Sequence, residues 1–588
     1  FTGGDVFTGP RTVVSAFSAG RRAAHSIDLF LRKKPVKSPG MPFNISKGPL
    51  DKVDLQNFVG VAKKARAKMP ELPAGARRNN FEEVDLGFSE ETAVQEAKRC
   101  LSCGCIDAFE CKLREYATEY GVDISNIEIW QEKKFEIDET HPYIIVDPNK
   151  CINCRRCMRN CSEYQCSDAI RLEPLEYDQK GKATFFGPVI NDNCVSCGLC
   201  VSNCPTGALI EKTKKQPGPF HLETTSTTCS VCGCGCNLIL NYIGNDLVKV
   251  TSDLKKKPNY GHLCIDGKFR YKDTNGRKRL DKPLIKQNGQ FILVEWDEAI
   301  SHVVQRLKTL QKTYSPESFA GIATPVCTNE EAYLFQKFLR AVIKTPNIDF
   351  FNSLSEIDIL PEFISLFSTT AEYRTIETAK QILITSDNPV AQYPIIDALV
   401  RRAQRKNKAT VAFVDDTLPD ISDELPTAFL YSKEIFKWDA NKLEQLLSMS
   451  GQRFLHLFPL VFKSNGLGLF NMGVAPNLFP GQKQANDIEE RKKLENAWKT
   501  NLPEQPGLSI GKILEKTLTE DIRVIYLMGD IPEDIEHLPP LPIEESEGTI
   551  TNIEGRISPL SVPVSMRGQN KQGKEIIAQI STLMGYLI

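Results

Sequence analysis

Eighteen of the 19 cysteines in this 588-residue chain lie between Cys100 and Cys264, and the nineteenth is Cys327. Disulfide frameworks belong to small secreted domains, whereas one dense cysteine segment in a large chain is typical of metal ligands in a reducing compartment. We therefore interpret the cysteines as metal ligands, with structural disulfides as the alternative. Their spacing divides most of them into four groups.

Two of these groups repeat one spacing, with gaps of two, two and three residues. They are Cys151, Cys154, Cys157 and Cys161, and then Cys194, Cys197, Cys200 and Cys204, which precedes Pro205. Two-residue gaps let three thiolates converge on one cube, and in two-cluster bacterial ferredoxins the fourth cysteine of each run ligates the other cluster. The spacing predicts one [4Fe–4S] cluster on Cys151, Cys154, Cys157 and Cys204, and another on Cys194, Cys197, Cys200 and Cys161. Zinc is the alternative, and Ser162 stands where the pattern has proline.

A third group is formed by Cys229, Cys232, Cys236 and Cys264, the last from a separate loop. It resembles the amino-terminal cluster segment of molybdopterin oxidoreductases, especially formate dehydrogenases, and of the large iron–sulfur subunit of respiratory complex I. The resemblance implies a third [4Fe–4S] cluster. The fourth group, Cys100, Cys103, Cys105 and Cys111, is the least regular, and is similar to cysteine segments of proteins like the glutamate synthase small subunit. A fourth cluster is expected there. Zinc is the alternative at both sites, and Cys166, Cys234 and Cys327 remain without an assigned role.

The first 30 residues contain a Gly3-Gly4-Asp5 turn and then the sequence Gly9-Pro10-Arg11-Thr12 at the start of a predicted helix. Glycine lets backbone approach a ligand closely, and Pro10 suits a first helical turn. The segment resembles the closing FAD motif of NADPH-linked flavoproteins of the glutamate synthase small-subunit family. The resemblance implies that Gly4, Asp5 and Thr12 bind FAD, with Asp5 at the ribityl chain. Most of the FAD site is expected in residues that precede Phe1.

The second half of the chain reads as α/β, because apolar runs alternate with helical stretches. We predict buried parallel strands at 381–385, 410–414 and 524–528, and a helix from Trp296 that Asp297 caps and that carries an apolar stripe (Ile300, Val303, Val304, Leu307 and Leu310). Four segments resemble degenerate versions of formate dehydrogenase sequence motifs: 386–389, 471–477, 528–532 and 551–556. The cysteine that holds molybdenum in that family has no counterpart, since Cys327 comes too early and residues 347–352 stand in its place. The resemblance therefore implies a relic domain without pterin or metal.

The expected fold is multidomain, α/β and α+β. Its parts are the end of an FAD-binding domain (1–35), a linker and cysteine-rich cluster segment (36–140), a two-[4Fe–4S] ferredoxin domain (141–215), a formate dehydrogenase-type [4Fe–4S] domain (220–275), and a degenerate molybdopterin oxidoreductase-like domain (276–588). The net charge of −1 gives no general case for nucleic-acid binding, and no apolar run is long enough to span a membrane. A cytoplasmic protein is expected.

The order of these parts predicts an electron-transferring subunit with four [4Fe–4S] clusters and FAD. It resembles the large iron–sulfur subunit of electron-bifurcating NADP transhydrogenases of the Sporomusa type. That resemblance implies NADP(H), ferredoxin, an FMN- and NAD-binding iron–sulfur subunit and a small [2Fe–2S] subunit as partners. Two alternatives remain: a subunit of an NADPH-linked formate dehydrogenase, and a non-catalytic iron–sulfur adaptor.

Overall fold

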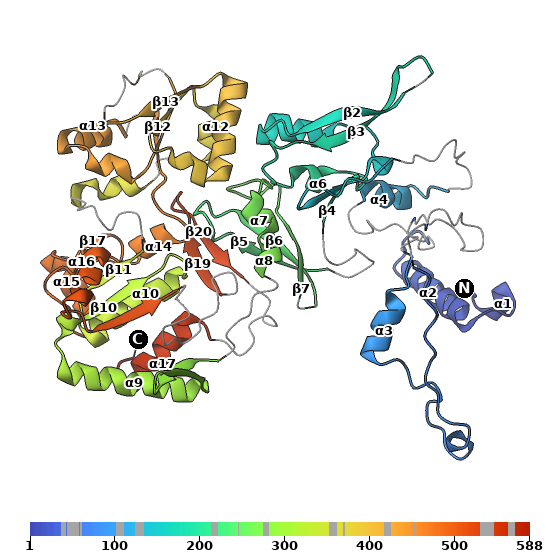
Figure 1. The fold of residues 1–588 in the computed structure, drawn as a ribbon, viewed down its shortest axis with the longest axis horizontal. Helices are drawn as coiled ribbons and strands as arrows, with labels where there is room; N and C mark the ends of the chain where they lie inside the picture. The colour runs from blue at the N-terminus through green and yellow to red at the C-terminus, as the bar shows by residue number, and fades with distance from the viewer. Residues whose placement is uncertain are drawn as a thin grey trace.

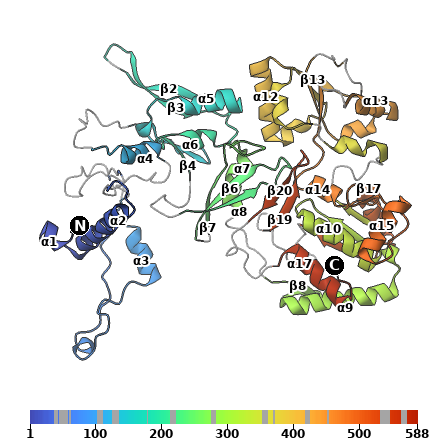
Figure 2. The same cartoon turned by 180° about the vertical axis from the view of Figure 1, so that it is seen from behind.

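The computed structural model describes residues 1–36, 43, 58, 62–101, 111–123, 135–177, 179–212, 222–244, 246–274, 282–351, 361–368, 371–416, 421, 425–450, 454–529, 546–561 and 571–587. Along its longest axis, helices α1 to α3 lie at one end and two parallel sheets lie at the other (Figure 1). The cysteine-rich segments lie between them, and the view from behind shows the same order (Figure 2).

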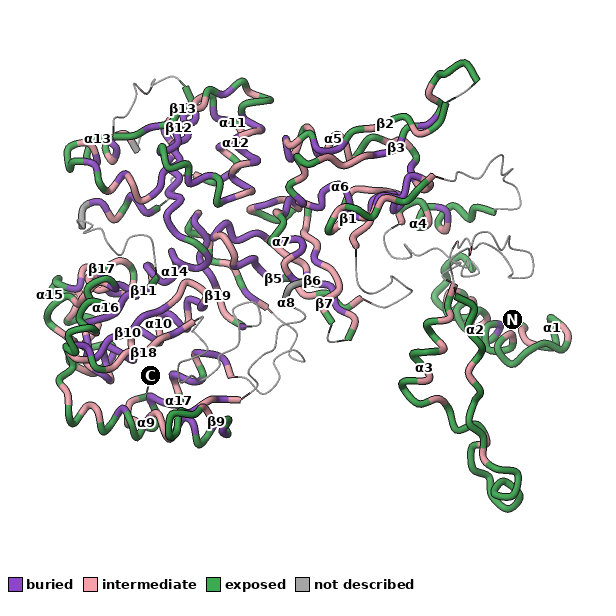
Figure 3. The backbone as a smooth tube through the Cα atoms, viewed as in Figure 1, coloured by how far each residue is buried: buried purple, intermediate pink, exposed green. Residues whose placement is uncertain are grey.

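The N-terminal part is mostly helix and loop. Its helices are α1 (Asp5–Thr8), α2 (Val13–Leu31), α3 (Glu90–Ala97) and α4 (Lys112–Glu119). Most residues of α1, α2 and α3 are exposed, in contrast to the buried centre of the molecule (Figure 3). The predicted linker and cysteine-rich cluster segment falls partly on residues 37–42, 44–57, 59–61, 102–110 and 124–134, which lie outside the described residues.

The next part carries the two repeated cysteine runs. Strand β1 (Ile144–Val146) pairs antiparallel with β4 (Leu209–Glu211), so Ile145 lies opposite Ile210. Between them come α5 (Arg156–Arg159), the π-helical η5 (Asn160–Gln165), the hairpin of β2 (Ile170–Tyr177) and β3 (Ala183–Ile190), and α6 (Leu199–Asn203). The pairing of β1 with β4 closes this part on itself, because residues from its two ends share one sheet.

A three-stranded antiparallel sheet carries the third cysteine group. Its strands are β5 (Glu223–Thr228), β6 (Asn237–Ile243) and β7 (Asp246–Thr251), and the short helices α7 (Ile265–Phe269) and α8 (Tyr271–Thr274) follow. Strand β5 also lies against the hairpin of β19 (Gly548–Thr551) and β20 (Ile557–Leu560), where the Thr228 hydroxyl donates to the Pro559 carbonyl at 2.8 Å. This contact joins the third cysteine group to the C-terminal part.

The C-terminal part is built on two parallel sheets. One has the order β11-β10-β18, with β10 (Phe319–Ala323), β11 (Ile348–Phe350) and β18 (Val524–Met528). The other has the order β13-β12-β14-β15, with β12 (Gln381–Thr385), β13 (Thr410–Val414), β14 (Thr427–Tyr431) and β15 (Leu455–Pro459). The three predicted strands therefore occur with the predicted bounds and are parallel.

Two details differ from expectation. Two of the three predicted strands are not fully buried, because β13 and β18 each lie at a sheet edge with no neighbouring strand on one side. Phe413 of β13 is 60% exposed, and within β18 only Met528 is buried. Helix α9 (Trp296–Thr313) has Glu295 rather than Asp297 at its N-cap. Asp297 lies in the first turn instead, where its carboxylate favours the helix by charge rather than by capping. The predicted apolar stripe of α9 does face the core.

The remaining elements cover the two sheets and join them. The helices are α10 (Asn329–Phe338), α11 (Arg374–Thr378), α12 (Pro394–Asn407), α13 (Ala440–Ser450), α14 (Gly466–Asn471), α15 (Ile488–Trp498), α16 (Ile510–Leu518) and α17 (Gly573–Leu583). The small hairpins are β8 (Leu284–Gln287) with β9 (Gln290–Leu293), and β16 (Leu478–Phe479) with β17 (Lys483–Gln484). Among the described residues, no helix is long and apolar enough to cross a membrane.

Candidate metal centres

The two repeated runs bring their thiols together across the runs. Burial raises the pKa of the Cys157 thiol to about 11, and the nearby thiols of Cys151, Cys204 and Cys154 add to the rise. Cys204 thus lies with the first run, although it closes the second. We call these four residues the Cys151 site.

The remaining thiols of the two runs are also buried close to one another. Burial raises the pKa of the Cys197 thiol to about 12, and the thiols of Cys161 and Cys194 raise it further. The buried Cys200 thiol has its pKa raised by burial and then by Cys197, Cys194, Cys157 and Cys161. We call Cys161, Cys194, Cys197 and Cys200 the Cys161 site. The interaction of Cys200 with Cys157 shows that the two sites are neighbours.

The backbone of the two runs repeats residue by residue. Asn153 and Arg155 have φ of 56° and 60°, and the equivalent Ser196 and Gly198 have 51° and 69°. These left-handed positions curl the chain around the space between the thiols. In each run the backbone N–H two residues after the first cysteine donates to its Sγ at 3.4 Å, from Asn153 to Cys151 and from Ser196 to Cys194. Donors aimed at sulfur are a known means of tuning iron–sulfur clusters.

The runs differ after their fourth cysteine. Cys161 lies inside the π-helical η5, and its Sγ accepts from the Ala169 N–H at 3.2 Å. Cys204 follows α6 and precedes Pro205, whose ring lacks the N–H needed to continue a helix. Ser162, the departure from the ferredoxin pattern, has that N–H. The departure therefore permits the helical turn of η5 after Cys161.

The third group is held in a tight double-glycine turn. Gly233 and Gly235 have φ of 84° and 66°. A Cβ on Gly233 would come within 2.8 Å of the Phe462 carbonyl, and a Cβ on Gly235 would come within 2.6 Å of the Asn552 side chain. The Asn552 amide donates to the Cys234 carbonyl at 3.0 Å. The turn is thus packed against the C-terminal part with no room for a side chain at these two positions.

The thiols of this group also lie together. Burial raises the pKa of Cys236 well above its ordinary value, and Cys229, Cys232 and Cys264 add to the rise. Cys264 caps α7, its Sγ accepting from the Gly267 N–H at 3.5 Å, and burial raises its pKa to about 11. We call Cys229, Cys232, Cys236 and Cys264 the Cys229 site. Cys234, which sequence reasoning left without a role, lies among these thiols, and its side chain is hydrogen-bonded to Cys232.

The fourth group is described only at its two ends. Cys100 is exposed and Cys111 is half-buried at the start of α4. Cys103 and Cys105 lie outside the described residues. The Leu113 N–H on α4 donates to the Pro205 carbonyl at 3.2 Å. The end of the fourth group therefore lies beside the Cys151 site, since Pro205 follows Cys204.

The predicted flavin residues lie on exposed chain. Gly4 has φ of 71° and precedes α1, in whose first turn Asp5 lies. The Thr12 hydroxyl caps α2 by accepting from the Ser15 N–H at 3.3 Å. Because α2 starts at Val13, Pro10 precedes the helix rather than lying in its first turn as expected. Most residues of α2 are exposed, and Ala19 is its one buried residue.

The segment where a molybdenum ligand would be expected is occupied by structural contacts. The buried Asp349 carboxylate accepts from the Ile510 N–H at 2.8 Å, and burial raises its pKa to about 6. The Asn347 amide donates to the carbonyls of Glu317 and Phe319. Cys327 is buried and donates to the Thr324 carbonyl at 3.2 Å. Asn352 and residues 530–532 lie outside the described residues.

The donor set of each completed site fits an iron–sulfur cluster. Buried thiols with raised pKa values stay protonated at neutral pH unless a cation compensates the thiolate charge, and metal binding supplies that cation as the protons leave. In the described residues, no three Cys, His, Asp or Glu side chains are already gathered at the spacing of a single metal ion. The fit therefore rests on the contacts among the thiols and on the shape of the loops that carry them.

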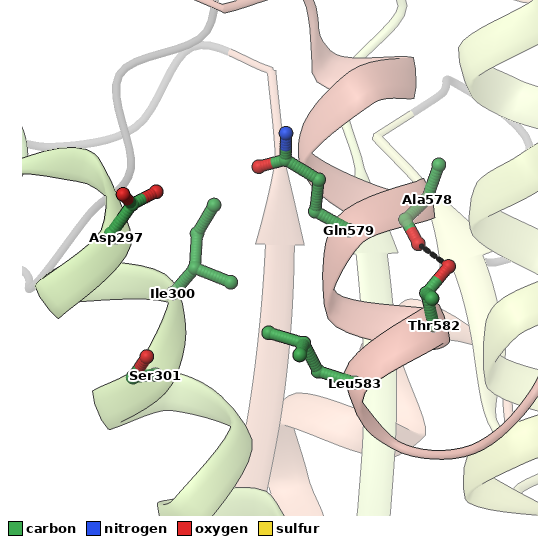
Figure 4. A pocket seen from close by; sticks show the side chains of 7 residues that line it. All are labelled: Asp297, Ile300, Ser301, Ala578, Gln579, Thr582 and Leu583. Atoms are coloured by element: carbon green, nitrogen blue, oxygen red, sulfur yellow. Dashed lines mark hydrogen bonds between the residues drawn. The ribbon is translucent and has the colours of Figure 1, made fainter.

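Two pockets formed by described residues lie away from the cysteines. One, of about 510 Å³, lies between α9 and α17 (Figure 4). Asp297 is its one charged side chain, and the Thr582 hydroxyl donates to the Ala578 carbonyl on its wall. The other, of about 850 Å³, lies beside Tyr314, Lys344 and Arg523. Neither contains a residue of the candidate sites.

Comparison with protein families divides the cysteine-rich and α/β parts in the same order as the structure. Residues 144–212 match the 4Fe-4S dicluster domain, residues 222–276 the molybdopterin oxidoreductase Fe4S4 domain, and residues 279–452 molybdopterin oxidoreductase. The Cys151 and Cys161 sites lie in the first match and the Cys229 site in the second.

Several proteins are similar to the chain over most of its length. An NADH-quinone oxidoreductase subunit of Rhizobium meliloti is 26% identical over 73% of this chain and 58% of its own. The alpha subunit of the NADPH-Fe(3+) oxidoreductase of Geobacter sulfurreducens is 26% identical over 82% of this chain and 70% of its own. A putative formate dehydrogenase of Staphylococcus haemolyticus is 22% identical over 95% of this chain and 73% of its own.

The chain spans less than two thirds of some of these relatives, 58% of the Rhizobium protein and 64% of a probable oxidoreductase of Bacillus subtilis. The matched domains nevertheless agree among themselves and with the relatives' names. The chain thus carries regions that match two iron–sulfur domains and a molybdopterin oxidoreductase domain, and the relatives with which it shares them are named as oxidoreductases.

Proposed function

We propose that the chain is the iron–sulfur flavoprotein subunit that relays electrons between an NADP(H)-linked FAD and partner subunits in a cytoplasmic electron-bifurcating transhydrogenase of NADPH, NAD and ferredoxin. The observation that carries the proposal is the convergence of twelve thiols into three sets, two of them neighbours. When bound, [4Fe–4S] clusters supply one-electron transfer. A flavin is the usual converter between such clusters and a two-electron hydride cofactor.

The residues have defined tasks under this proposal. The Cys151, Cys161 and Cys229 sites would each hold one [4Fe–4S] cluster. A fourth cluster would be held by Cys100, Cys103, Cys105 and Cys111. The backbone donors at Asn153, Ser196 and Gly267 would stabilise thiolate charge at the first three. Gly4, Asp5 and Thr12 would contribute to an FAD site. The name of the Geobacter relative, an NADPH-Fe(3+) oxidoreductase, supports NADP(H) as the hydride cofactor.

The α/β part would act as a scaffold without pterin. Its support is the hydrogen bonding at Asn347 and Asp349, where carboxylate and amide are already used by the fold. It would seat the Cys229 site and provide docking surface for an FMN- and NAD-binding iron–sulfur subunit and a small [2Fe–2S] subunit. Ferredoxin would be the remaining partner.

One experiment tests the whole proposal: iron, flavin, molybdenum and tungsten are quantified on the purified complex, and the clusters are followed spectroscopically after NADPH is added. We expect about 16 iron atoms per chain, four for each of four clusters, no molybdenum or tungsten, and cluster reduction by NADPH. About 8 iron atoms would exclude four clusters. Normal iron with no reduction by NADPH would favour an adaptor.

The match of residues 279–452 to molybdopterin oxidoreductase favours one second candidate, a subunit of an NADPH-linked formate dehydrogenase. That enzyme would carry molybdenum or tungsten equimolar with the chain. The same metal analysis therefore separates the two candidates.

A further inference from the structure

Two buried contacts join the dicluster part to the loop and helix of Cys264, and both involve the Cys161 site. In the first, His262 Nε2 is hydrogen-bonded to Gln165 Oε1. Gln165 lies four residues after Cys161 in η5, and His262 lies two residues before Cys264. One hydrogen bond therefore spans the gap between the two cysteines.

The surroundings hold this contact in place. His262 is 1% exposed, and its backbone is fixed by Asn259, which accepts from the His262 N–H and donates its amide to the His262 carbonyl at 2.8 Å. The ring of Tyr164 lies edge-on to His262 at 5.3 Å, and Arg402 of α12 stacks over Tyr164 at 4.3 Å. Side chains from three parts of the chain thus fix the geometry of the imidazole.

In the second contact, Lys268 of α7 lies against Gly198. A Cβ on Gly198 would come within 2.8 Å of Lys268 Cγ, so the lysine stem fills the space that a side chain would take. Gly198 lies between Cys197 and Cys200, and Lys268 is four residues after Cys264. Lys268 is 1% exposed, and its Nζ donates to the Val250 carbonyl at 2.7 Å.

The charges around Lys268 leave a net positive charge at this contact. Lys268 pairs with Glu211 Oε2 at 3.2 Å, Lys272 pairs with Glu211 Oε1 at 3.4 Å, and the Tyr271 hydroxyl donates to the same carboxylate. Two ammonium groups thus share one carboxylate. A buried positive charge favours the more reduced, more negative state of a nearby redox centre.

The Cys151 site has different neighbours. Cys151 packs with Phe185 and Ala208, with Phe135 beside them, and Pro205 contacts α4 after Cys111. The contacts therefore order these parts along the molecule: Cys111 at the start of α4, the Cys151 site, the Cys161 site and the Cys229 site. Figures 1 and 2 show the same order from α4 through α6 to α7.

We propose that the His262–Gln165 pair and Lys268 form the junction for electron transfer between the Cys161 site and the Cys229 site. The inference rests on the proposed function, and it adds the residues of the junction and the position of each site in the relay. One electron leaves one site and arrives at the other, with no bond formed or broken and no proton moved. His262 and Gln165 fix the separation, and Lys268 raises the reduction potential on both sides of the contact.

The test uses the full complex with Lys268→Met, which keeps the stem and removes the charge, and Lys268→Arg, which keeps the charge. Exposed Lys255→Met is the control on the loop before Cys264. In a redox titration followed by electron paramagnetic resonance, we expect Lys268→Met to lower the potentials of the clusters at the Cys161 and Cys229 sites. The potential at the Cys151 site should stay unchanged, and Lys268→Arg should restore the other two.

Two further variants, His262→Phe and Gln165→Leu, remove the hydrogen bond and keep comparable volume. After rapid mixing with reductant and freeze-quenching, the reduced signal of the Cys229 site should appear at least tenfold later than in the unaltered complex, with iron content unchanged. The proposed junction would be contradicted if the reduced signal of the Cys229 site appeared as early in Gln165→Leu as in the unaltered complex and the cluster potentials were unchanged in Lys268→Met. Loss of iron in Gln165→Leu would assign the pair a structural role and overturn it as well.

Each mixing experiment is run with NADPH and, separately, with dithionite. If NADPH reduces no cluster in the unaltered complex, the proposed function fails, whereas the dithionite traces still show whether the junction controls the Cys229 site. The two proposals can therefore fail independently.

Discussion

The two cysteine runs of the dicluster part have the same backbone conformation, but they contact different neighbouring elements. Equivalent positions in both runs are left-handed, and equivalent N–H groups donate to the first sulfur of each. After the fourth cysteine the runs diverge: η5 continues past Cys161 to Gln165 and contacts α12 and His262, whereas Pro205 follows Cys204 and contacts α4. The repeated part of each run shapes a metal site, and the unrepeated end determines which neighbour that site faces.

The largest effect is expected from Cys204→Ser. Because Cys204 lies with Cys151, Cys154 and Cys157, the cluster at the Cys151 site should become labile or lose iron, since serine oxygen is a harder and poorer ligand than thiolate. Iron analysis and electron paramagnetic resonance would measure the loss. Cys161→Ser is the matched control and should damage the Cys161 site instead. Damage to the site nearest in sequence in both variants would show that the runs do not exchange ligands.

A smaller effect is expected from Gly198→Ala. The new methyl group would meet the Lys268 stem at 2.8 Å at a position with φ of 69°, so we expect a loss of about 1–3 kcal/mol in the free energy of unfolding. Arg155→Ala is the control at the equivalent position, where the residue already tolerates a φ of 60°. Thermal unfolding of both variants measures the difference. Equal losses would mean that the contact with Lys268 does not distinguish the runs.

Arg405→Ala should have a local effect only. Arg405 of α12 donates to the Ser162 carbonyl at 2.7 Å and pairs with Asp168, but the pair is largely exposed, so its contribution to stability is at most about 1 kcal/mol. We expect faster amide hydrogen exchange in η5 and no change in α6. Lys112→Ala, which removes an exposed ion pair with Glu115 on α4, is the control and should leave η5 unaffected. Unchanged exchange in η5 would show that α12 does not hold this end of the run.

Asp5→Ala should leave the iron sites of both runs unchanged, because helix α1, which begins at the exposed Asp5, lies apart from the dicluster part (Figure 1). Under the proposed flavin site, the variant retains less FAD while its iron content stays normal. Flavin released by denaturation and iron per chain are measured on the same sample. Unchanged flavin content would remove Asp5 from the flavin site.

Local spacing explains what could be predicted from sequence. The gaps between cysteines fix which thiols can share one turn, and apolar runs located β12, β13 and β18 to the residue. The spacing of apolar residues does not tell whether a strand lies at the edge or in the centre of a sheet, so the exposure of the edge strand β13 was missed. The cap of α9 and the start of α2 were also missed, because a suitable residue type stands within two or three positions of the actual helix end.

The junction residues could not be predicted in the same way. His262 and Lys268 lie beside Cys264 in sequence, but their partners Gln165 and Gly198 are many residues away, and no periodic pattern links them. A lysine in the short helix that follows a predicted metal ligand was the one available signal. Its burial becomes evident only when the dicluster part packs against α7.

The crossing of Cys204 into the Cys151 site has a consequence for biosynthesis. A chain growing on the ribosome has three thiols of that site early, but the fourth emerges only after the hairpin of β2 and β3 and the second run. The sheet partner of β1 emerges later still, since β4 follows Cys204. Under the proposed ligation, the cluster machinery of the cell would meet a competent acceptor only once this whole part has been made, and a chain interrupted before Cys204 would be left with an incomplete site that proteases can recognise.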